Sequence, residues 1–421
     1  MAPLQQPPRN PADPPDPATA IDAPLAGVKV LDLSRILAGP YCAMILGDMG
    51  AEVIKVEAVG AGDDMRGWGP PFVNGEGAYF LTINRNKKSL AVDLKSPRGR
   101  EILHKLVDEA DVLVENFRPG TTERLGLGWE ELHARNPRLV YCSISGFGQT
   151  GPRKYEASFD LICQGEAGLM GVTGFPDGSP TKVGIAISDL VAALWAVQGI
   201  LMALYQRGEN GEGRYVDISL LDSLVSLLTF QAGIHFTTGE DPGRKGNAHA
   251  TVAPYETYPA ADGYFNLAVG NDSLWSRFCR AAGREDLEKD PRFAVNRDRV
   301  TNRIALNEIL ERVFRNKPVA HWLEILKEAG IPCGRINSMS HVFTDPQVIE
   351  RGMIFTLDHP VAGKVQVPGS PLKLSETPPI PAAAPPLVGQ HTREILADLG
   401  YSQADVDQLE EAGVVQSCPP K

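Results

Sequence analysis

The chain has 421 residues, 43% of them hydrophobic and 22% charged, which is typical of a globular protein with more than one domain. Its formal net charge of −11 at pH 7 argues against a nucleic acid or an anionic membrane as a partner. The six cysteines form no CxxC pair, so they predict free thiols in a cytoplasmic protein and no metal site.

Residues 1–24 are rich in Pro, Ala and Asp and lack the basic start and apolar core of a signal peptide, so a disordered tail is predicted. Five short apolar stretches are then predicted as strands, with helices between them, at residues 28–33, 52–56, 89–93, 111–115 and 139–143. This alternation indicates an α/β fold with a Rossmann-like, doubly wound sheet. The first turn, Ser34–Pro40, has no GxGxxG pattern, so the sheet does not imply a dinucleotide cofactor.

Three segments follow the tail. Residues 25–225 are predicted to form most of a large Rossmann-like domain. The sequence then becomes loop-rich, and afterwards helical and charged, which predicts a smaller α-rich domain at 226–335. Residues 336–421 are predicted to be a linker that returns to the large domain, with an extended Pro-rich run at Pro378–Pro386.

One acid stands out by its position. A short apolar run at 183–187, predicted as a strand, meets Ser188 and Asp189, and an apolar helix follows to about residue 205. Ser and Asp cap helix starts, where N–H groups and the helix dipole would keep Asp189 ionised. Asp189 is therefore either a helix cap or a carboxylate nucleophile beside a cleft. The apolar helix is too short to predict a membrane span.

Three further stretches could carry chemistry. Asn84–Ser89 holds three cations that suit a phosphate or carboxylate, although a solvated face is the ordinary explanation. Glu115–Gly120 follows an apolar strand at the edge where open α/β sheets bind ligands, and a simple Pro-Gly turn is the alternative. Ser145–Pro152 is a glycine-rich segment that either lines a site or forms a plain loop.

Taken together, these motifs resemble the family III CoA-transferases from about residue 25 to the C-terminus. The matching segments are Gly27–Ser34, Ala38–Pro40, Gly47–Glu57, Asn84–Ser89, Val114–Gly120, Ser145–Pro152, Asp189-Leu190, Gly211–Asp217 and Gly389–His391. The resemblance implies a Rossmann-like large domain, a small domain and a homodimer of two interlocked subunits.

The resemblance also implies roles for individual residues. Asp189 would be the nucleophile, forming a mixed anhydride and then an aspartyl-CoA thioester, and Asp160 would orient or polarise groups near it. Coenzyme A, as acyl-CoA, would be a substrate, with no tightly bound cofactor. The residues corresponding to CoA contacts are Val92, Asp93, Leu94, Lys95, Asn116, Phe117, Arg118 and Arg124.

Departures from the family pattern bear on the substrate. Leu37 and Phe159 replace a Gln and a Tyr of the formyl-CoA:oxalate transferases, Ala58 replaces an Arg, and the segment around His249 replaces a tetraglycine lid. Transfer of CoA between formyl-CoA and oxalate is therefore kept only as an alternative. The α-methylacyl-CoA racemases have a His at the position of Phe159, and because Phe cannot transfer a proton, racemisation is the less favoured alternative.

Residues 60–72 and 84–89 are most similar to the succinyl-CoA:dicarboxylate branch. The predicted function is transfer of CoA from an acyl-CoA, with succinyl-CoA as a candidate donor, to a short dicarboxylic acid. Arg85 or Arg66 would bind the distal carboxylate, and His249 is a second candidate. A non-catalytic CoA-binding protein would require the loss of Asp189 or of the CoA contacts, and the sequence retains both.

Overall fold

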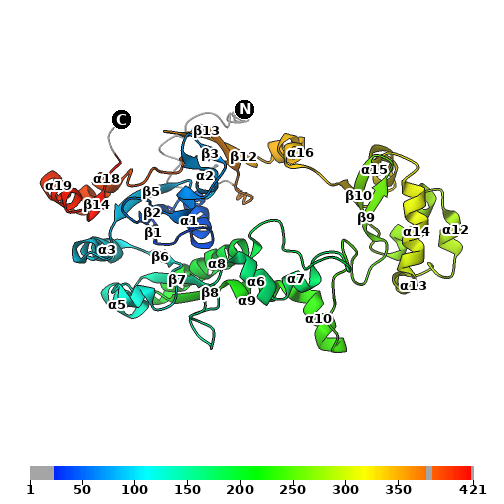
Figure 1. The fold of residues 1–421 in the computed structure, drawn as a ribbon, viewed down its shortest axis with the longest axis horizontal. Coiled ribbons are helices and arrows are strands. Elements are labelled where there is room, and N and C mark those ends of the chain that lie inside the picture. The colour runs from blue at the N-terminus through cyan, green and yellow to red at the C-terminus, as the bar shows by residue number, and fades with distance from the viewer. Residues whose placement is uncertain (1–22, 376–381, 419–421) are drawn as a thin grey trace, which may run out of the picture. The chain divides into compact units, whose positions relative to one another are not determined.

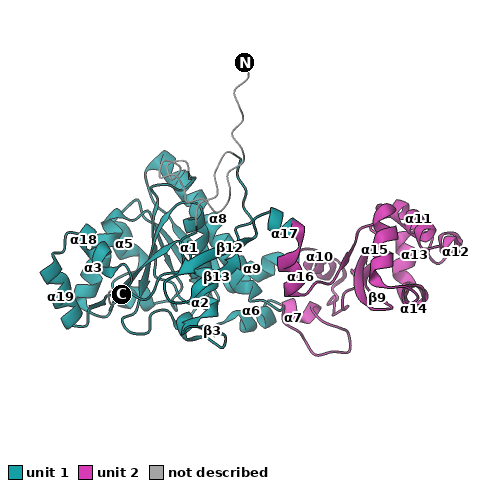
Figure 2. Ribbon diagram, turned by 90° about the horizontal axis from the view of Figure 1, so that it is seen from above, with its two compact units in different colours: residues 1–167, 184–228, 347–421 teal, residues 168–183, 229–346 magenta. Residues whose placement is uncertain are grey.

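The structure is a computed structural model that describes residues 23–375 and 382–418. Most of the predicted tail, and part of the Pro-rich run, lie outside the described residues. The chain forms two compact units, of residues 1–167, 184–228 and 347–421 and of residues 168–183 and 229–346 (Figure 2). The second unit thus also takes residues 168–183, which the sequence placed in the large domain, and extends to 346 rather than 335.

A seven-stranded sheet forms the centre of the first unit (Figure 1). All its neighbouring strands are parallel except β14 and β5 at one edge, which are antiparallel. Its parallel strands have the order of a doubly wound dinucleotide-binding fold, so the prediction of a parallel-dominated α/β sheet is confirmed. Along the sheet the strands are β14 (Val415–Gln416), β5 (Lys87–Val92), β2 (Glu52–Glu57), β1 (Lys29–Asp32), β6 (Val112–Glu115), β7 (Val140–Ser145) and β8 (Tyr215–Ser219).

Helices cover both faces of this sheet (Figure 1). One face packs against α1 (Ala38–Asp48) and α8 (Ile187–Asn210), which also contact each other. The other packs against α3 (Pro97–Glu109), α5 (Trp129–Arg135), α18 (Thr392–Asp398) and α19 (Gln403–Glu411) around a core that includes Leu31, Ile102 and Leu396. The shorter helices of this unit are α2 (Ala78–Ile83), α4 (Thr121–Arg124), α6 (Asp160–Glu166), α9 (Leu220–Val225), α17 (Pro346–Glu350) and 3-10 turns at Asp64–Gly67 and Ser226–Leu228.

The C-terminal segment completes the sheet. Strand β14 pairs antiparallel with β5, and the Thr392 hydroxyl accepts a hydrogen bond from the backbone N of Ala91 at 3.2 Å. The backbone N of Ser89 donates to Nδ1 of His391 at 3.1 Å. β5 is therefore not an exposed edge. Two hairpins, β12 (Ile354–His359) with β13 (Gly363–Pro368) and β3 (Phe72–Val73) with β4 (Glu76–Gly77), also belong to this unit.

The second unit has its own core. Its three-stranded antiparallel sheet consists of β11 (Cys333–Arg335), β10 (Gly263–Ala268) and β9 (Tyr255–Ala260). Buried aromatic residues such as Phe265, Phe278 and Phe314 join this sheet to the surrounding helices. The helices are α7 (Leu169–Val172), α10 (Thr229–Thr238), α11 (Asp272–Ala281), α12 (Glu285–Lys289), α13 (Asn296–Thr301), α14 (Arg303–Phe314), α15 (Val319–Glu328) and α16 (Met339–Thr344).

Helix α8 differs from its prediction at its start. The structure has no strand at 183–187, where Ile185 is 52% exposed, and the helix begins at Ile187. By length and composition α8 could cross a membrane, but buried helices of soluble proteins meet the same criterion. One side of α8 packs against α1, β7 and β8.

Candidate active site

A cavity of about 700 Å³ opens at the carboxyl end of the sheet, where β1 and β6 run in neighbouring positions and the chain leaves them in opposite directions. Ligands of doubly wound sheets bind at this switch point. The residues predicted to contact CoA that line it are Val92, Asp93, Leu94, Lys95, Phe117 and Arg124. The fold therefore brings together predicted contacts that follow two different strands, β5 and β6.

The other two predicted contacts do not line the cavity. Asn116 spans the switch point, since its side chain accepts from the backbone N of Arg35 at 2.8 Å and donates to the carbonyl O of Arg35 at 2.7 Å. It thus fixes the turn after β1, and Arg35 itself lines the cavity. Arg118 is exposed on the neighbouring loop.

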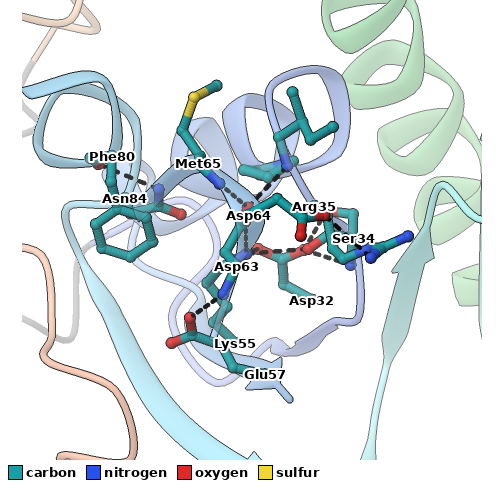
Figure 3. A network of polar contacts seen from close by, with 12 residues as sticks. Asp32, Ser34, Arg35, Lys55, Glu57, Asp63, Asp64, Met65, Phe80 and Asn84 are labelled. Atoms are coloured by element: carbon teal, nitrogen blue, oxygen red, sulfur yellow. Dashed lines mark hydrogen bonds and ion pairs between the residues drawn. The ribbon is translucent and has the colours of Figure 1, made fainter. Parts of the chain in front are cut away.

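The floor of the cavity rests on a buried network of charges (Figure 3). Asp32 of β1, Lys55 of β2 and Lys87 of β5 are completely or almost completely buried. Nζ of Lys87 donates to Asp32, to the carbonyl of Pro40 and to Asn84, each at 2.8 Å. Three acceptors require three protons, so Lys87 is an ammonium ion.

Lys55 connects this network to the cavity wall. Its Nζ lies 2.8 Å from the Asp63 carboxylate and donates to the carbonyl O of Ser34 at 3.0 Å. Burial by itself would raise the pKa of Asp32, but the charges of Lys55 and Lys87 outweigh it and hold that pKa below its usual value. Asp63 in turn accepts from the backbone N of Ile36, whose φ of 70° is strained for a β-branched residue.

The three cations of Asn84–Ser89 pair with acids of the same chain, so the structure does not support the anion site considered for this stretch. Arg85 is buried and makes a bidentate pair with Asp48, at 2.6 and 2.8 Å. Lys87 belongs to the buried network, and Lys88 pairs with Glu52 and Glu394, both at 2.9 Å. The partners lie far away in sequence, which is why sequence patterns could not reveal them.

Arg66, the other candidate for a distal carboxylate, is also occupied. It makes a bidentate pair with Glu57 at 2.7 Å, and its guanidinium lies 3.6 Å from the centre of the Phe80 ring. Neither arginine proposed to read a second carboxylate is therefore free to do so. Each also donates to a backbone carbonyl of the C-terminal part of the chain, Arg85 to Pro368 and Arg66 to Pro386, both at 2.9 Å.

Asp189 lies in the first turn of α8 but is not its cap. The capping position is Ala186, and the backbone N–H of Ser188 is satisfied by a residue from another helix, Asp160 of α6. One oxygen of Asp160 accepts from the backbone N of Ser188 at 2.9 Å and from its hydroxyl at 2.8 Å. The other accepts from Nε2 of Gln164 at 2.8 Å.

The two carboxylates thus differ sharply. Within the described residues, the only hydrogen-bond donor to the Asp189 side chain is the backbone of Asp189 itself. Burial and, after it, the negative charge of Asp160 raise the pKa of Asp189 to about 7. The expectation that the helix start keeps Asp189 fully ionised is wrong, because loss of solvent outweighs the local N–H groups. A pKa near neutrality suits a group that must be ionised to attack.

The remaining predicted residues lie in different surroundings. Phe159 precedes α6 and is 60% exposed, and Leu37 packs beside Met44 and Phe80 at the start of α1. His249 belongs to the second unit, where its ring stacks on Phe230 with centroids 5.5 Å apart. Its Nδ1 accepts from the backbone N of Thr251 at 3.2 Å, so it helps to order that loop.

Sequence reasoning missed Ser188 and Gln164, which hold Asp160, and Arg35 and Lys55, which line the cavity. Only the spacing of Gln164 four residues after Asp160, one helical turn, offered a signal. Within residues 23–375 and 382–418, no group of three His, Cys, Asp or Glu side chains could hold a metal ion.

Comparison with known proteins shows the family of the chain. CoA-transferase family III matches residues 25–392. The chain is 43% identical to the succinyl-CoA:glutarate CoA-transferase of Mus musculus, over 93% of this chain and 90% of that protein. It is 40% identical to the succinate–glutarate CoA-transferase of Agrobacterium fabrum, over 89% and 96% of the two chains. A crystal structure of a CaiB/BaiF family protein from Brucella suis is 41% identical, with a TM-score of 0.81, over 90% and 99% of the chains. The chain belongs to CoA-transferase family III.

Replacing Arg85 tests its structural role. Arg85→Met should lower the free energy of unfolding by roughly 3–5 kcal/mol, because it leaves the buried Asp48 carboxylate unpaired. The double variant Asp48→Asn/Arg85→Met should recover much of this loss, and Arg98→Met on the exposed side of α3 should change little. Urea unfolding measures all three. A stable Arg85→Met variant with a selectively raised KM for dicarboxylates would instead support the ligand role.

The raised pKa of Asp189 predicts how stability depends on pH. The unfolded chain ionises at about the ordinary value of 3.8, and the folded one at about 7. Folding therefore loses about 1.4 kcal/mol per pH unit from this residue as the pH rises through that window, and the loss is constant above it. Asp189→Asn removes the effect. It should be more stable than the parent by about 2–4 kcal/mol at pH 8 and by little at pH 4.

Proposed function

We propose that this CoA-transferase moves CoA from succinyl-CoA to a short dicarboxylic acid through a covalent intermediate on Asp189. The observation that carries the proposal is the contrast between two neighbouring carboxylates. Asp160 is held by three hydrogen bonds, whereas Asp189 is left without a donor from another described residue and has a pKa of about 7. Such a pair separates a fixed anion from a reactive one.

The proposed reaction has two matching halves. A carboxylate oxygen of Asp189 attacks the thioester carbonyl carbon of the acyl-CoA, the C–S bond breaks, and CoA leaves as a thiolate. The thiolate then attacks the aspartyl carbonyl of the mixed anhydride and releases the donor acid, giving an aspartyl-CoA thioester. The acceptor carboxylate attacks this thioester, and the returning thiolate takes the acceptor acyl group and frees Asp189.

The cavity at the switch point is the proposed site for the CoA moiety. Arg35, Lys95 and Arg124 line it and supply positive charge for phosphates. Val92, Phe117 and Leu125 line it with apolar surface suited to a base or to the pantetheine chain. This combination suits a nucleotide thioester better than a small anion.

The dicarboxylate preference rests on the names of the two relatives, both glutarate CoA-transferases. Because Arg85 and Arg66 are both paired inside the protein, another group must bind the second carboxylate. Phe159 at the start of α6 offers no group for proton transfer, so nothing favours racemisation.

The assembly is proposed to be a cytoplasmic homodimer of interlocked subunits. The side of α8 turned away from the sheet exposes Leu194, Trp195, Leu201 and Met202, the last at 63%. A continuous apolar helix face of this kind is commonly covered by a partner chain. A second copy of this chain is the partner that the family resemblance implies.

A panel of acceptors tests the substrate class. With succinyl-CoA as donor, glutarate should be used with a kcat/KM at least roughly tenfold higher than pentanoate, which has the same length but one carboxylate fewer. CoA thioester formation can be followed by chromatography. Equal rates for the two acids would contradict a dicarboxylate preference without affecting the covalent mechanism.

Trapping tests the nucleophile. The enzyme incubated with succinyl-CoA and hydroxylamine should carry a hydroxamate on Asp189, found by peptide mass spectrometry, because hydroxylamine cleaves aspartyl thioesters and anhydrides. Asp189→Ala should reduce kcat by roughly 1000-fold or more. Asp222→Asn, in the first turn of the neighbouring helix α9, is the matched control and should retain activity. A hydroxamate on another residue would exclude Asp189.

A further inference from the structure

We propose that Ser188 and Gln164 are positioning residues that hold the Asp160 carboxylate as a fixed anion against the start of α8, and thereby set the position and reactivity of Asp189. This inference rests on the proposed function of Asp189 as nucleophile. Ser188 and Gln164 are both neutral, and in this role neither has to touch a substrate.

The geometry makes Asp160 the cap of a helix to which it does not belong. Asp160 is the first residue of α6, yet its carboxylate accepts the backbone N–H and the hydroxyl of Ser188, the second residue of α8. An external carboxylate at this position satisfies an N–H group that the helix cannot satisfy itself. Because Asp189 follows Ser188 directly, the same contact fixes the backbone that carries the nucleophile.

Gln164 completes the arrangement from the other side. It lies one turn after Asp160 on α6, is completely buried, and donates from Nε2 to the second carboxylate oxygen at 2.8 Å. The same nitrogen lies 3.4 Å from the carbonyl O of Ile185, in the segment that enters α8. Gln164 therefore orients Asp160 and connects it to the chain just before the nucleophile.

These three contacts hold the Asp160 carboxylate in place beside the start of α8. A fixed anion beside Asp189 opposes ionisation of Asp189, so the ionised nucleophile is more basic. When Asp189 attacks the thioester, negative charge moves from its carboxylate to the substrate oxygen. The repulsion between the two carboxylates then decreases, which favours the transition state over the ground state.

Other charges near α8 have partners or lie on other surfaces. The elements packed against it are α1, α6, α9, β7 and β8. Their acids include Asp48, which pairs with Arg85, and Asp217, which accepts from the backbone N of Gln149 at 3.1 Å. Asp222 is exposed in the first turn of α9. Cys163 of α6 is a further titratable group beside it, and burial raises the pKa of this thiol, so it stays neutral. Asp160 is thus the charged side chain that acts on Asp189 within the described residues.

The test compares Gln164→Met, Ser188→Ala and Ser188→Thr with the parent enzyme. Gln164→Met keeps the length of the side chain but removes the donor, and Ser188→Thr keeps the hydroxyl. The rate of aspartyl-CoA formation from succinyl-CoA is followed by intact mass spectrometry in single turnovers from pH 5 to 9. Thermal midpoints and CoA affinity are measured in parallel, with Gln408→Met on the exposed face of α19 as control.

In Gln164→Met and Ser188→Ala, loss of a donor lets the Asp160 carboxylate move away from Asp189, so Asp189 should ionise more easily. The acid limb of the pH profile should move to lower pH by about half a unit to one unit, and the plateau rate should fall by roughly tenfold. CoA affinity should be unchanged, and Ser188→Thr should restore the profile of the parent. Lower rates and midpoints with an unmoved acid limb would overturn the proposal, because that result marks a purely structural role.

A second measurement separates this proposal from the proposed function. In protein labelled with ¹³C at the aspartate carboxyl carbons, the Asp189 signal is identified by its absence from Asp189→Asn and titrated without substrate. Its midpoint should be near neutral pH and should fall in Gln164→Met. If no aspartyl-CoA forms but the midpoint shifts as expected, the proposed reaction fails and the positioning role stands. If aspartyl-CoA forms but the midpoint does not shift, the positioning role fails.

Discussion

The buried ion network of Asp32, Lys55 and Lys87 is the constraint on which the rest of the first unit depends. It joins β1, β2 and β5 on the face covered by α1, where no water can replace a missing partner. A buried charge is tolerated only when it is fully paired, so the three side chains fix one another's positions. Through the carbonyls of Ser34 and Pro40 they also fix the turn from β1 into α1, and this turn forms one wall of the cavity.

The same principle continues outward from this network. Asp63 pairs with Lys55 and accepts a hydrogen bond from the strained backbone of Ile36. Asn116 makes hydrogen bonds with both the backbone N–H and the backbone carbonyl of Arg35. The turn after β1 is therefore fixed from two sides by residues of distant segments. A rigid turn at the switch point lets a large ligand bind without ordering the loop first, which reduces the entropic cost of binding.

The two carboxylates of the proposed catalytic pair, Asp160 and Asp189, differ in how many hydrogen bonds they accept. Asp160 has a donor for each oxygen and stays in place, whereas Asp189 is half-buried and poorly satisfied. A nucleophile with a full set of donors would be stable and unreactive. The small number of hydrogen bonds to the buried Asp189 carboxylate lowers the free energy of unfolding at neutral pH. Such local instability is common at sites where a protein carries out chemistry.

The sequence alone predicted the alternation of strands and helices and, through the family resemblance, the family and Asp189 as the candidate nucleophile. These follow from patterns within short segments: apolar runs of strand length, glycine and proline at turns, and motifs in a fixed order. The family resemblance also indicated the segments around Val92 and Phe117, which line the same cavity.

Which charged side chains have an ion-pair partner became clear only from the folded structure. Arg85 and Lys87 belong to one cationic stretch, but Asp48 and Asp32, which neutralise them, lie on other elements of the fold. The strand expected before Asp189 is absent, and the helix start is satisfied by Asp160 instead. Ion pairs, burial and pKa values depend on distances between residues remote in sequence, and the Coulomb energy of a pair is set by those distances and by the surrounding dielectric. The sequence therefore indicated the candidate nucleophile, and the fold shows how that acid is held and charged.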